Sequence, residues 1–462
     1  MTETHKFLDP NSELIALSTF GNTKNVFVIA MEIEGPFDES VFRQSVLGTL
    51  ELYPELDCCL RESIRNGRRH LHWHPVTDLE FPVTVSDLKG YEPSRPVLET
   101  ILEHLSPRLD RDWNLFEEGP GEAHLLRVSK DHHIVVALIH HAVVDAVTAA
   151  EIGRQFFLKY KELITGVKDD LQGVITGSVS TSRKRAAKVK KFELRDFVHN
   201  VRLALAPLFL KPQLPVGSGI PGDKNQRQIK RVLSEEDTAR LTMTAQKSGG
   251  VFIDILVASG NLAIEKWNSL QNVQTGMVTT SVTMSIRGRY ESLEHSNNVS
   301  AIFFESTPQE REDSKKLLRS LAISRIGQLR KQMDLRNYEN VSRMITLLSF
   351  LPFKIRRRVT HHVIQKHKWS IGITLLGVMW PEMKNGKPTI DSYPLCVNET
   401  QITEVYGTGY KTMTDTPLLL IVYFFRRRIN FILTASGSLF TQEEADTFMD
   451  MLIDTLKRGL NS

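Results

Sequence analysis

The stretch IVVALIHHAVVDAVTAA, residues 134–150, contains the most informative pattern in this sequence. Its first six residues, 134–139, are all apolar, which predicts a central β-strand covered on both faces. His140 and His141 follow the strand, and Asp145 precedes a helical pattern. Side chains alternate along a strand, so the two imidazoles point to opposite faces and only one can face a given cleft. We therefore expect one reactive histidine at the end of a buried strand.

The chemistry that suits this histidine is proton transfer. A neutral imidazole can take a proton from a hydroxyl or an amine near neutral pH, and Asp145 can hold the loop by hydrogen bonds or an ion pair. A metal site made from His133, His140 and His141 is disfavoured, because no further ligand cluster has suitable spacing. A serine hydrolase is also disfavoured, because the sequence has no G-x-S-x-G turn.

Segments on both sides of this stretch predict further strands and helices. In the N-terminal part, strand patterns occur at 25–34, 69–76 and 121–129. Asp38 stands at a helix N-cap position, before apolar residues at helical spacing (Phe42, Val46, Leu50 and Tyr53). The helix after Asp145 should end near Gly166. Two other histidine pairs, 132–133 and 361–362, we expect in surface loops.

The C-terminal part has the same alternation. Strands are predicted at 227–234 and 277–287, helices at 235–248 and 251–267, and a hairpin at 418–436. Ser234 with Asp237, and Thr441 with Glu444, are paired as helix caps. The whole is an α/β protein, with an N-terminal lobe at 1–168, a linker rich in proline and glycine at 169–226, and a C-terminal lobe at 227–462.

The linker contains two unusual segments. The run RKRAAKVKK, 183–191, has six basic residues and no acid, and it is either a solvated linker or a contact for phosphates or an anionic surface. Residues 192–210 predict a helix that is apolar on more than one side, which would pack across the lobes or lie at a lipid interface. A further segment, 346–359, joins an apolar face to Arg356, Arg357 and Arg358, as a core helix or as the lip of a channel for lipid-like chains.

Composition excludes several classes of protein. The chain has 462 residues, 41% of them hydrophobic, and a net charge of +4; without the six charges of the basic run the net charge would be −2. The basic run contains no aromatic residue, whereas a nucleic-acid reader usually has basic residues spread over a structured face with aromatics among them, so nucleic acid is the least favoured partner. Three scattered cysteines predict no disulfide framework and favour the cytoplasm. The N-terminus is not a signal peptide, and the longest apolar runs fall short of the ~18–20 residues that cross a bilayer.

HHAVVDA, residues 140–146, closely resembles the HHxxxDG motif of the chloramphenicol-acetyltransferase-like superfamily, which includes peptide-synthetase condensation domains and polyketide-associated acyltransferases. The resemblance extends loosely along the chain. Residues 42–60 are similar to the family's early helix, SIRGRYES and NNVS within 285–300 to its strand ending in arginine with a later asparagine, and 370–379 to a late strand. The DFGWG segment of the plant enzymes is absent.

The resemblance implies a role for each matching residue. His141 would be the general base, His140 would support it, and Asp145 would form an ion pair with a C-lobe arginine, best matched by Arg287. Ser370 or Thr374 would line the site opposite the base. Ala146 replaces the usual glycine, a change that a helix N-terminus should tolerate.

The fold implied is two acyltransferase lobes, each a mixed sheet with flanking helices, and a tunnel between them. The enzyme would move an acyl group from a thioester, either acyl-CoA or an acyl carrier protein, to a hydroxyl or amine, in lipid or secondary-metabolite biosynthesis. No metal, tightly bound cofactor or covalent acyl-enzyme is expected.

Two other functions stay open: a condensation-type enzyme that forms amides on carrier-bound substrates, and a non-catalytic scaffold that binds carriers. We expect a stand-alone monomer that touches no nucleic acid, with peripheral membrane contact left open. The basic segments 183–191 and 356–358 are candidates for meeting the phosphates of CoA or an acidic carrier.

Overall fold

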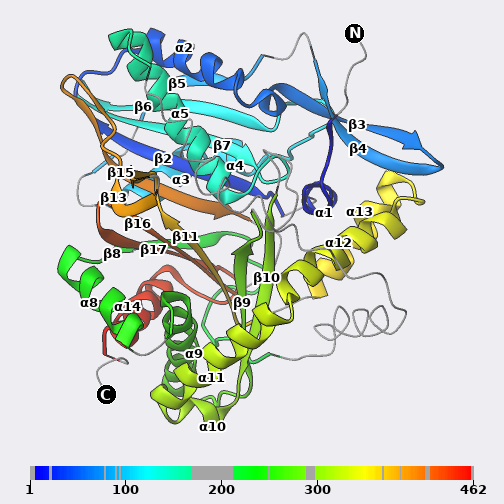
Figure 1. Ribbon diagram of the computed structural model, residues 1–462, viewed down its shortest axis with the longest axis vertical. Coiled ribbons are helices and arrows are strands. Elements are labelled where there is room, and N and C mark those ends of the chain that lie inside the picture. The colour runs from blue at the N-terminus through cyan, green and yellow to red at the C-terminus, as the bar shows by residue number, and fades with distance from the viewer. Residues whose placement is uncertain are drawn as a thin grey trace.

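The computed structural model describes the chain except for residues 1–5, 20–22, 77–79, 89–90, 93–94, 169–211, 248–249, 288–296, 367–368, 386, 412–416 and 459–462. The described part contains two six-stranded mixed sheets stacked between layers of helices (Figure 1). This arrangement confirms the predicted two-lobed α/β fold. None of its described helices is both long and apolar enough to cross a membrane.

The first sheet has the order β14-β15-β2-β7-β6-β5. Its strands are β2 (Val26–Glu34), β5 (Val83–Asp87), β6 (Gly121–Ser129), β7 (His132–His140), β14 (Cys396–Val397) and β15 (Thr400–Tyr410). β7 lies between β2 and β6 and is buried almost throughout, as the apolar run predicted. Helices α2 (Glu39–Leu50) and α5 (Ala146–Thr165) cover one face (Figure 1). Asp38 caps α2, and Gly166 ends α5 with a φ of +68°, both as expected.

The second sheet has the order β10-β9-β11-β16-β17-β8. Its strands are β8 (Gln226–Val232), β9 (Val278–Ser285), β10 (Val299–Ser306), β11 (Ile371–Val378), β16 (Leu418–Phe425) and β17 (Arg428–Ser436). Helices α8 (Glu235–Lys247), α9 (Phe252–Leu270), α11 (Ser314–Arg330) and α14 (Gln442–Arg458) lie on its outer side. The predicted hairpin is present between β16 and β17. Both predicted cap pairs are hydrogen-bonded: the Asp237 N–H donates to Ser234 Oγ, and Thr441 and Glu444 bond reciprocally.

The inner face of the second sheet packs against the first lobe. Ile421, Tyr423 and Phe425 of β16 belong to the same apolar core as β2 and β7, whereas Leu418, Leu420 and Val422 face the core under α9 and α14. The alternation along β16 therefore separates an inter-lobe face from an outer face.

Two segments from the C-terminal half cross to the N-terminal half. β15 pairs with β2 along its length, with Gly407 beside Ile29, although the sequence assigned all of 227–462 to the second lobe. Helices α12 (Met333–Leu348) and α13 (Phe353–Lys366) pack on α1 (Pro10–Ser18) through Leu14, Leu17 and Ile345. The sheets thus do not follow the predicted division at 168 and 226, and those boundaries stay a prediction.

The remaining elements are short. A three-stranded sheet contains β1 (Lys6–Phe7), β3 (Cys58–Arg65) and β4 (Arg68–Pro75), and β12 (Pro381–Lys384) pairs with β13 (Lys387–Ser392). The short helices are η1 (Pro54–Asp57), α3 (Val97–His104), α4 (Ser106–Leu109) and α10 (Pro308–Arg311).

Some expectations about loops were wrong or fall outside the described residues. His132 and His133 begin strand β7, where His133 is buried, and His361 and His362 lie within helix α13. Neither pair is in a surface loop, because adjacent polar residues also occur inside elements with one exposed face. The basic run 183–191 and the predicted helix 192–210 lie outside the described residues.

Candidate active site

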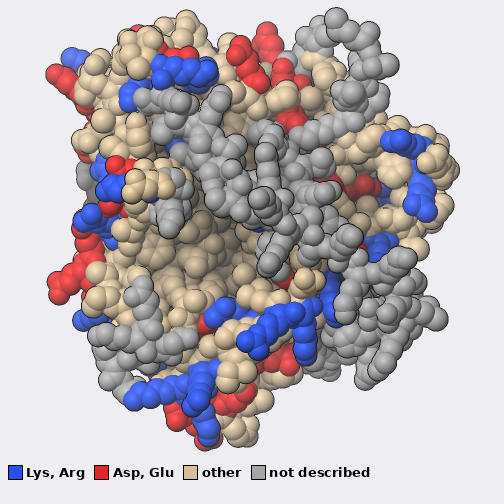
Figure 2. All heavy atoms as spheres, viewed as in Figure 1, with Lys and Arg blue, Asp and Glu red and all other residues tan. Residues whose placement is uncertain are grey.

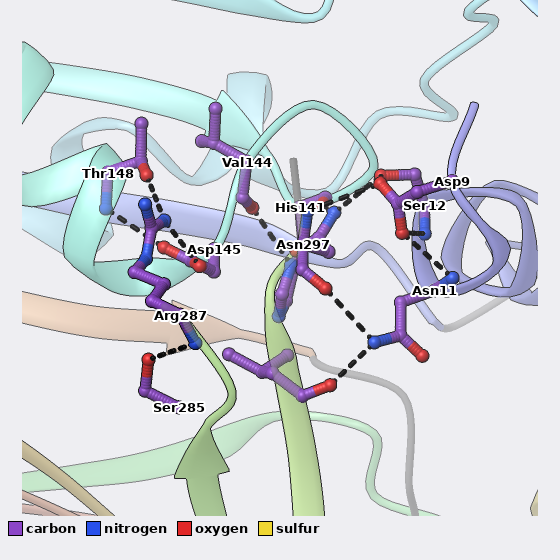
Figure 3. Close-up of polar contacts among 11 residues, drawn as sticks. Asp9, Asn11, Ser12, His141, Val144, Asp145, Thr148, Ser285, Arg287 and Asn297 are labelled. Atoms are coloured by element: carbon purple, nitrogen blue, oxygen red, sulfur yellow. Dashed lines mark hydrogen bonds and ion pairs between the residues drawn. The ribbon is translucent and has the colours of Figure 1, made fainter. Parts of the chain in front are cut away.

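His141 lies at the loop between β7 and α5 and is partly exposed. Its backbone N–H donates to the Asn25 carbonyl at 2.7 Å, and its Nδ1 lies 3.1 Å from the Val144 carbonyl (Figure 3). A carbonyl can only accept, so Nδ1 carries the proton and the neutral ring presents the lone pair of Nε2. The Phe27 ring, 4.2 Å away between centroids, supports one face of the imidazole.

His140 has the opposite environment. It is fully buried, and its Nδ1 accepts a hydrogen bond from the Ala142 N–H at 3.1 Å. The other nitrogen, Nε2, therefore carries the proton and donates to the Thr19 hydroxyl at 3.1 Å. With both ring nitrogens engaged inside the protein, His140 is a structural residue.

Burial lowers the pKa of both histidines. It lowers the pKa of His140 to about 3, with a smaller contribution from the neighbouring His141. Burial is also the main cause of the lowered pKa of His141, while the Asp145 carboxylate and hydrogen bonding work against it. Both rings are therefore neutral near pH 7, and within the described part of the chain no hydrogen bond occupies Nε2 of His141, which leaves it to accept a proton.

Asp145 joins the two lobes beside His141. It is the N-cap of α5, with Oδ1 accepting from the Thr148 N–H at 3.0 Å. Its Oδ2 lies 2.6 Å from Nη2 of Arg287, which follows β9 of the second sheet and also donates to the Thr148 hydroxyl (Figure 3). The predicted ion pair between Asp145 and Arg287 is thus present, and the carboxylate is 1% exposed.

A second, uncharged connection reaches His141 from the other side. Asn297, just before β10, donates through Nδ2 to the His141 carbonyl at 2.8 Å and to Ser12 Oγ at 2.7 Å. Asp9, the N-cap of α1, accepts from the Asn297 N–H, and Asn11 donates to the carbonyls of Asn297 and Val299. Figure 3 shows this network beside the base. The loop that carries His141 is therefore held by α1 and by the second lobe.

The remaining predicted site residues are placed differently. Ser370 lies at the far end of β9, where its N–H donates to the Thr279 carbonyl and its hydroxyl donates to the Gln213 carbonyl. Six residues of strand, ~20 Å, separate Thr279 from Ser285 at the end of β9 nearest Arg287, so Ser370 is not brought to the site. Thr374 is closer, bonded at 3.2 Å to the Thr283 hydroxyl on the inter-lobe face.

Ala146, in place of the glycine of the motif, is the first residue of α5. Its backbone is helical there, and the methyl group packs against the first core. This placement agrees with the expectation that the substitution is tolerated.

Several residues of the site were missed from sequence. Asp9, Asn11 and Ser12 were not singled out, although Asp-Pro at 9–10 is a common start of a helix, with proline at its first position. That signal marks the helix but not its contact with Asn297, which comes from residues 286 positions away. Within the described residues, no three histidine, cysteine, aspartate or glutamate side chains are grouped as metal ligands would be.

Comparison with known families gives a match over more than half of the chain. Residues 17–285 match the model of the Condensation domain family. This span contains the two histidines, Asp145 and strand β9. No curated protein sequence matches the chain.

Three solved structures similar to this one are domains of synthetases. The first condensation domain of the calcium-dependent antibiotic synthetase, in complex with a substrate analogue, covers 100% of this chain and 97% of its own, with a TM-score of 0.66 and 14% identity. The epimerization domain from the third module of tyrocidine synthetase B covers 100% and 97%, with a TM-score of 0.64 and 16% identity. A mutant starter condensation domain of rhizomide synthetase in complex with C8-CoA covers 99% and 95%, with a TM-score of 0.64 and 13% identity. These likenesses show the fold.

Proposed function

The chain belongs to the condensation-domain family, and from this we propose that it transfers an acyl group from a thioester to a hydroxyl or amine, with His141 as the general base. The observation that carries the proposal is the state of the His141 ring. Nδ1 is bound to the Val144 carbonyl, Nε2 is the free acceptor, and the side chain is partly exposed beside the second lobe.

The reaction needs one base and two correctly placed substrates. The hydroxyl or amine of the acceptor gives its proton to Nε2 of His141 while its oxygen or nitrogen attacks the thioester carbonyl carbon. The tetrahedral adduct then collapses, the C–S bond breaks, and the proton passes from Nε2 to the departing thiolate. Because the acceptor attacks directly, no acyl-enzyme forms. General-base catalysis supplies ~10²–10⁴-fold, and positioning of the two substrates supplies much of the rest.

The acyl donor is acyl-CoA or an acyl group on the phosphopantetheine of a carrier protein. The starter condensation domain with C8-CoA, similar in fold, supports a CoA thioester, and the family match supports a carrier-bound one. The mechanism requires no metal or tightly bound cofactor. A passage that leads both substrates to His141 is part of this proposal.

The setting is proposed to be the cytoplasm, with the chain acting as a monomer in lipid or secondary-metabolite biosynthesis. The three cysteines support a reducing compartment: Cys58 and Cys59 are buried free thiols, and Cys396 is an exposed one. The sequence suggests Arg356, Arg357 and Arg358 as a group that contacts phosphates, but the three side chains are not equally accessible. Arg356 is fully buried and paired with Glu13 and Glu62, so it is not available to a ligand.

The second candidate is a condensation-type enzyme that forms amides on carrier-bound substrates, which the family match favours. A non-catalytic carrier-binding scaffold is less well supported, because His141, Asp145 and Arg287 are all present in a connected site.

The experiment is a turnover assay with a panel of acyl-CoA thioesters, measured as free thiol with and without alcohol and amine acceptors. Thiol release that requires an acceptor, together with an acylated product, supports O- or N-acylation from CoA. A change in the intact mass of an acyl-loaded carrier protein, with no turnover of CoA thioesters, supports the carrier-dependent alternative. No turnover with either donor, under conditions where the protein is folded, argues for the scaffold.

A further inference from the structure

The β3–β4 hairpin and the helices α12 and α13 form a projecting surface beside α1. The hairpin extends from the body beside α13 (Figure 1). The Arg69 N–H donates to the Ser349 carbonyl at 2.8 Å, which fixes β4 against the turn between α12 and α13. Arg356 of α13 is buried between Glu13 of α1 and Glu62 of β3. The hairpin and the helix are thus parts of one rigid surface.

Large apolar side chains are exposed on this surface. Ile64 is 66% exposed, Leu347 63% and Phe350 57%, with Ile355 and Val359 also exposed. Side chains two apart on a strand share a side, so Ile64 points to the same side as Glu62, which contacts α13. Ile355 and Val359 are one helical turn apart on the outer face of α13. Ile64 thus lies on the side of the hairpin that Glu62 turns toward α13, and all five apolar side chains are exposed to solvent.

Unpaired basic side chains accompany them. Arg65 and Arg68 stand directly opposite each other across the hairpin turn, a placement of like charges that destabilises a two-stranded ladder. Basic side chains are visible there at the right-hand edge of Figure 2. Lys354 and Arg358, one turn apart, are exposed on α13, and residues 346–366 contain no acid. Among the described residues, none of these four cations has an acidic partner within ion-pair distance.

We propose that this hairpin–helix surface, consisting of Ile64, Leu347, Phe350, Ile355 and Val359 with Arg65, Arg68, Lys354 and Arg358, binds the headgroup region of an anionic lipid bilayer. Apolar side chains enter the boundary between headgroups and acyl chains, while arginine and lysine bind lipid phosphates. The anionic lipids supply the counter-charge that the opposed arginines lack within the described protein.

The shape of the surface favours a bilayer over a protein partner. The apolar residues lie on a projecting hairpin and on the outside of a helix, whereas a partner protein is bound through an interface with a packed apolar centre. The guanidinium of Arg68 lies 5.2 Å from the centre of the Phe350 ring, which combines a cation with an apolar group as in interfacial membrane contacts. A nucleic acid would not use the exposed aliphatic side chains.

The test is co-sedimentation of the full chain with vesicles of phosphatidylcholine alone and of phosphatidylcholine mixed with phosphatidylglycerol. We expect binding to the anionic vesicles that weakens as salt is raised. The double variant Arg65→Glu, Lys354→Glu should partition at least ~30-fold more weakly, since each basic residue near the surface contributes about fivefold. The double variant Ile64→Asp, Phe350→Asp should also lose binding.

Matched controls lie on the far side of the molecule. Lys266→Glu with Arg319→Glu makes the same change in net charge on α9 and α11, and Leu270→Asp changes an equally exposed leucine; these should bind as the unaltered protein does. Circular dichroism and thiol release from soluble acyl-CoA should be unchanged in every variant. Absence of binding to anionic vesicles, binding that survives the hairpin–helix changes, or preferential capture of an acidic carrier protein by this surface would each overturn the proposal.

Discussion

His140 and His141 are adjacent at the end of β7, but they lie on opposite faces of the strand and their surroundings are very different. On one side His140 is closed in, with both ring nitrogens bonded to Thr19 and Ala142. On the other side His141 faces the second lobe, with Nδ1 bonded to the Val144 carbonyl and Nε2 without a hydrogen bond from any residue that the structure describes. The strand's alternation thus turns one imidazole into a part of the framework and leaves the other to react. The difference teaches that the role of each histidine follows from its face and not from its residue type.

Removing His141 should have the largest effect on catalysis. We predict that His141→Ala lowers kcat/KM at least ~100-fold, since the general base is lost, with little change in the melting temperature because the ring is partly exposed. Steady-state thiol release and thermal unfolding measure the two quantities. Near-full turnover in a folded His141→Ala protein would show that another group is the base.

Breaking the ion pair between Asp145 and Arg287, beside His141, should have the second-largest effect. Asp145→Ala removes the cap of α5 and leaves Arg287 without its carboxylate, and we expect a loss of about 3 kcal/mol in the free energy of unfolding together with lower activity. Asp145→Asn, which can still cap the helix, separates the cap from the charge. A double-mutant cycle with Asp145→Ala and Arg287→Ala measures the coupling free energy between the two side chains. If the effects of the two single variants on the free energy of unfolding simply add in the double variant, the ion pair has no structural role.

Changing the buried His140 should affect stability more than catalysis. His140→Gln disturbs two buried hydrogen bonds and should cost ~1–3 kcal/mol of unfolding free energy, while kcat/KM falls far less than in His141→Ala. Thr19→Val removes one of the same bonds without touching the ring. If His140→Gln lost activity as severely as His141→Ala while staying equally stable, the assignment of roles would be reversed.

The burial of His140 also predicts that the stability of the protein depends on pH. The pKa of His140 is lowered to about 3 in the folded protein, against ~6.5 in the unfolded chain. Below pH 6.5 the unfolded chain therefore binds the extra proton, and the protein loses up to ~1.4 kcal/mol per pH unit through this group, whereas above 6.5 the group has no effect. Urea unfolding of the protein and of His140→Gln between pH 7 and 5 isolates this slope as the difference between them; parallel curves would contradict it.

The smallest effect is expected in the pH dependence of kcat/KM, which reports the pKa of His141. Because burial lowers the pKa of His141, the acid limb of kcat/KM should have its midpoint below the ~6.5 of a free imidazole. Asp145→Asn removes a charge that raises this pKa, so it should move the midpoint further down. A midpoint above 6.5 in the unaltered protein would mean that His141 is not the titrating base.

Local features of the fold and site could be predicted from the sequence. The caps at Asp38, Ser234 and Thr441 and the end of α5 at Gly166 involve residues within four positions of one another, where side-chain chemistry and spacing decide the structure. Resemblance to a known motif added the partner of Asp145, which spacing alone does not indicate.

Features that depend on which distant segments meet were missed. The resemblance of 370–379 to the family's late strand implies that Ser370 lies opposite the base. However, β11 runs parallel to β9, so the start of β11 lies at the end of the sheet away from Arg287. The contact between Asn11 and Asn297 joins two segments with no shared local pattern. The apolar pattern of β15 suits either sheet, and nothing in it selects β2 as the partner.

The pairing of β15 with β2 has a consequence for biosynthesis. Strand β2 is paired on one side only, with β7, until residues 400–410 supply its other partner. During translation the first sheet therefore stays incomplete, with an apolar strand edge unpaired, until residues 400–410 have left the ribosome. A truncated chain ending before residue 400 should aggregate, and the nascent protein has reason to depend on chaperones.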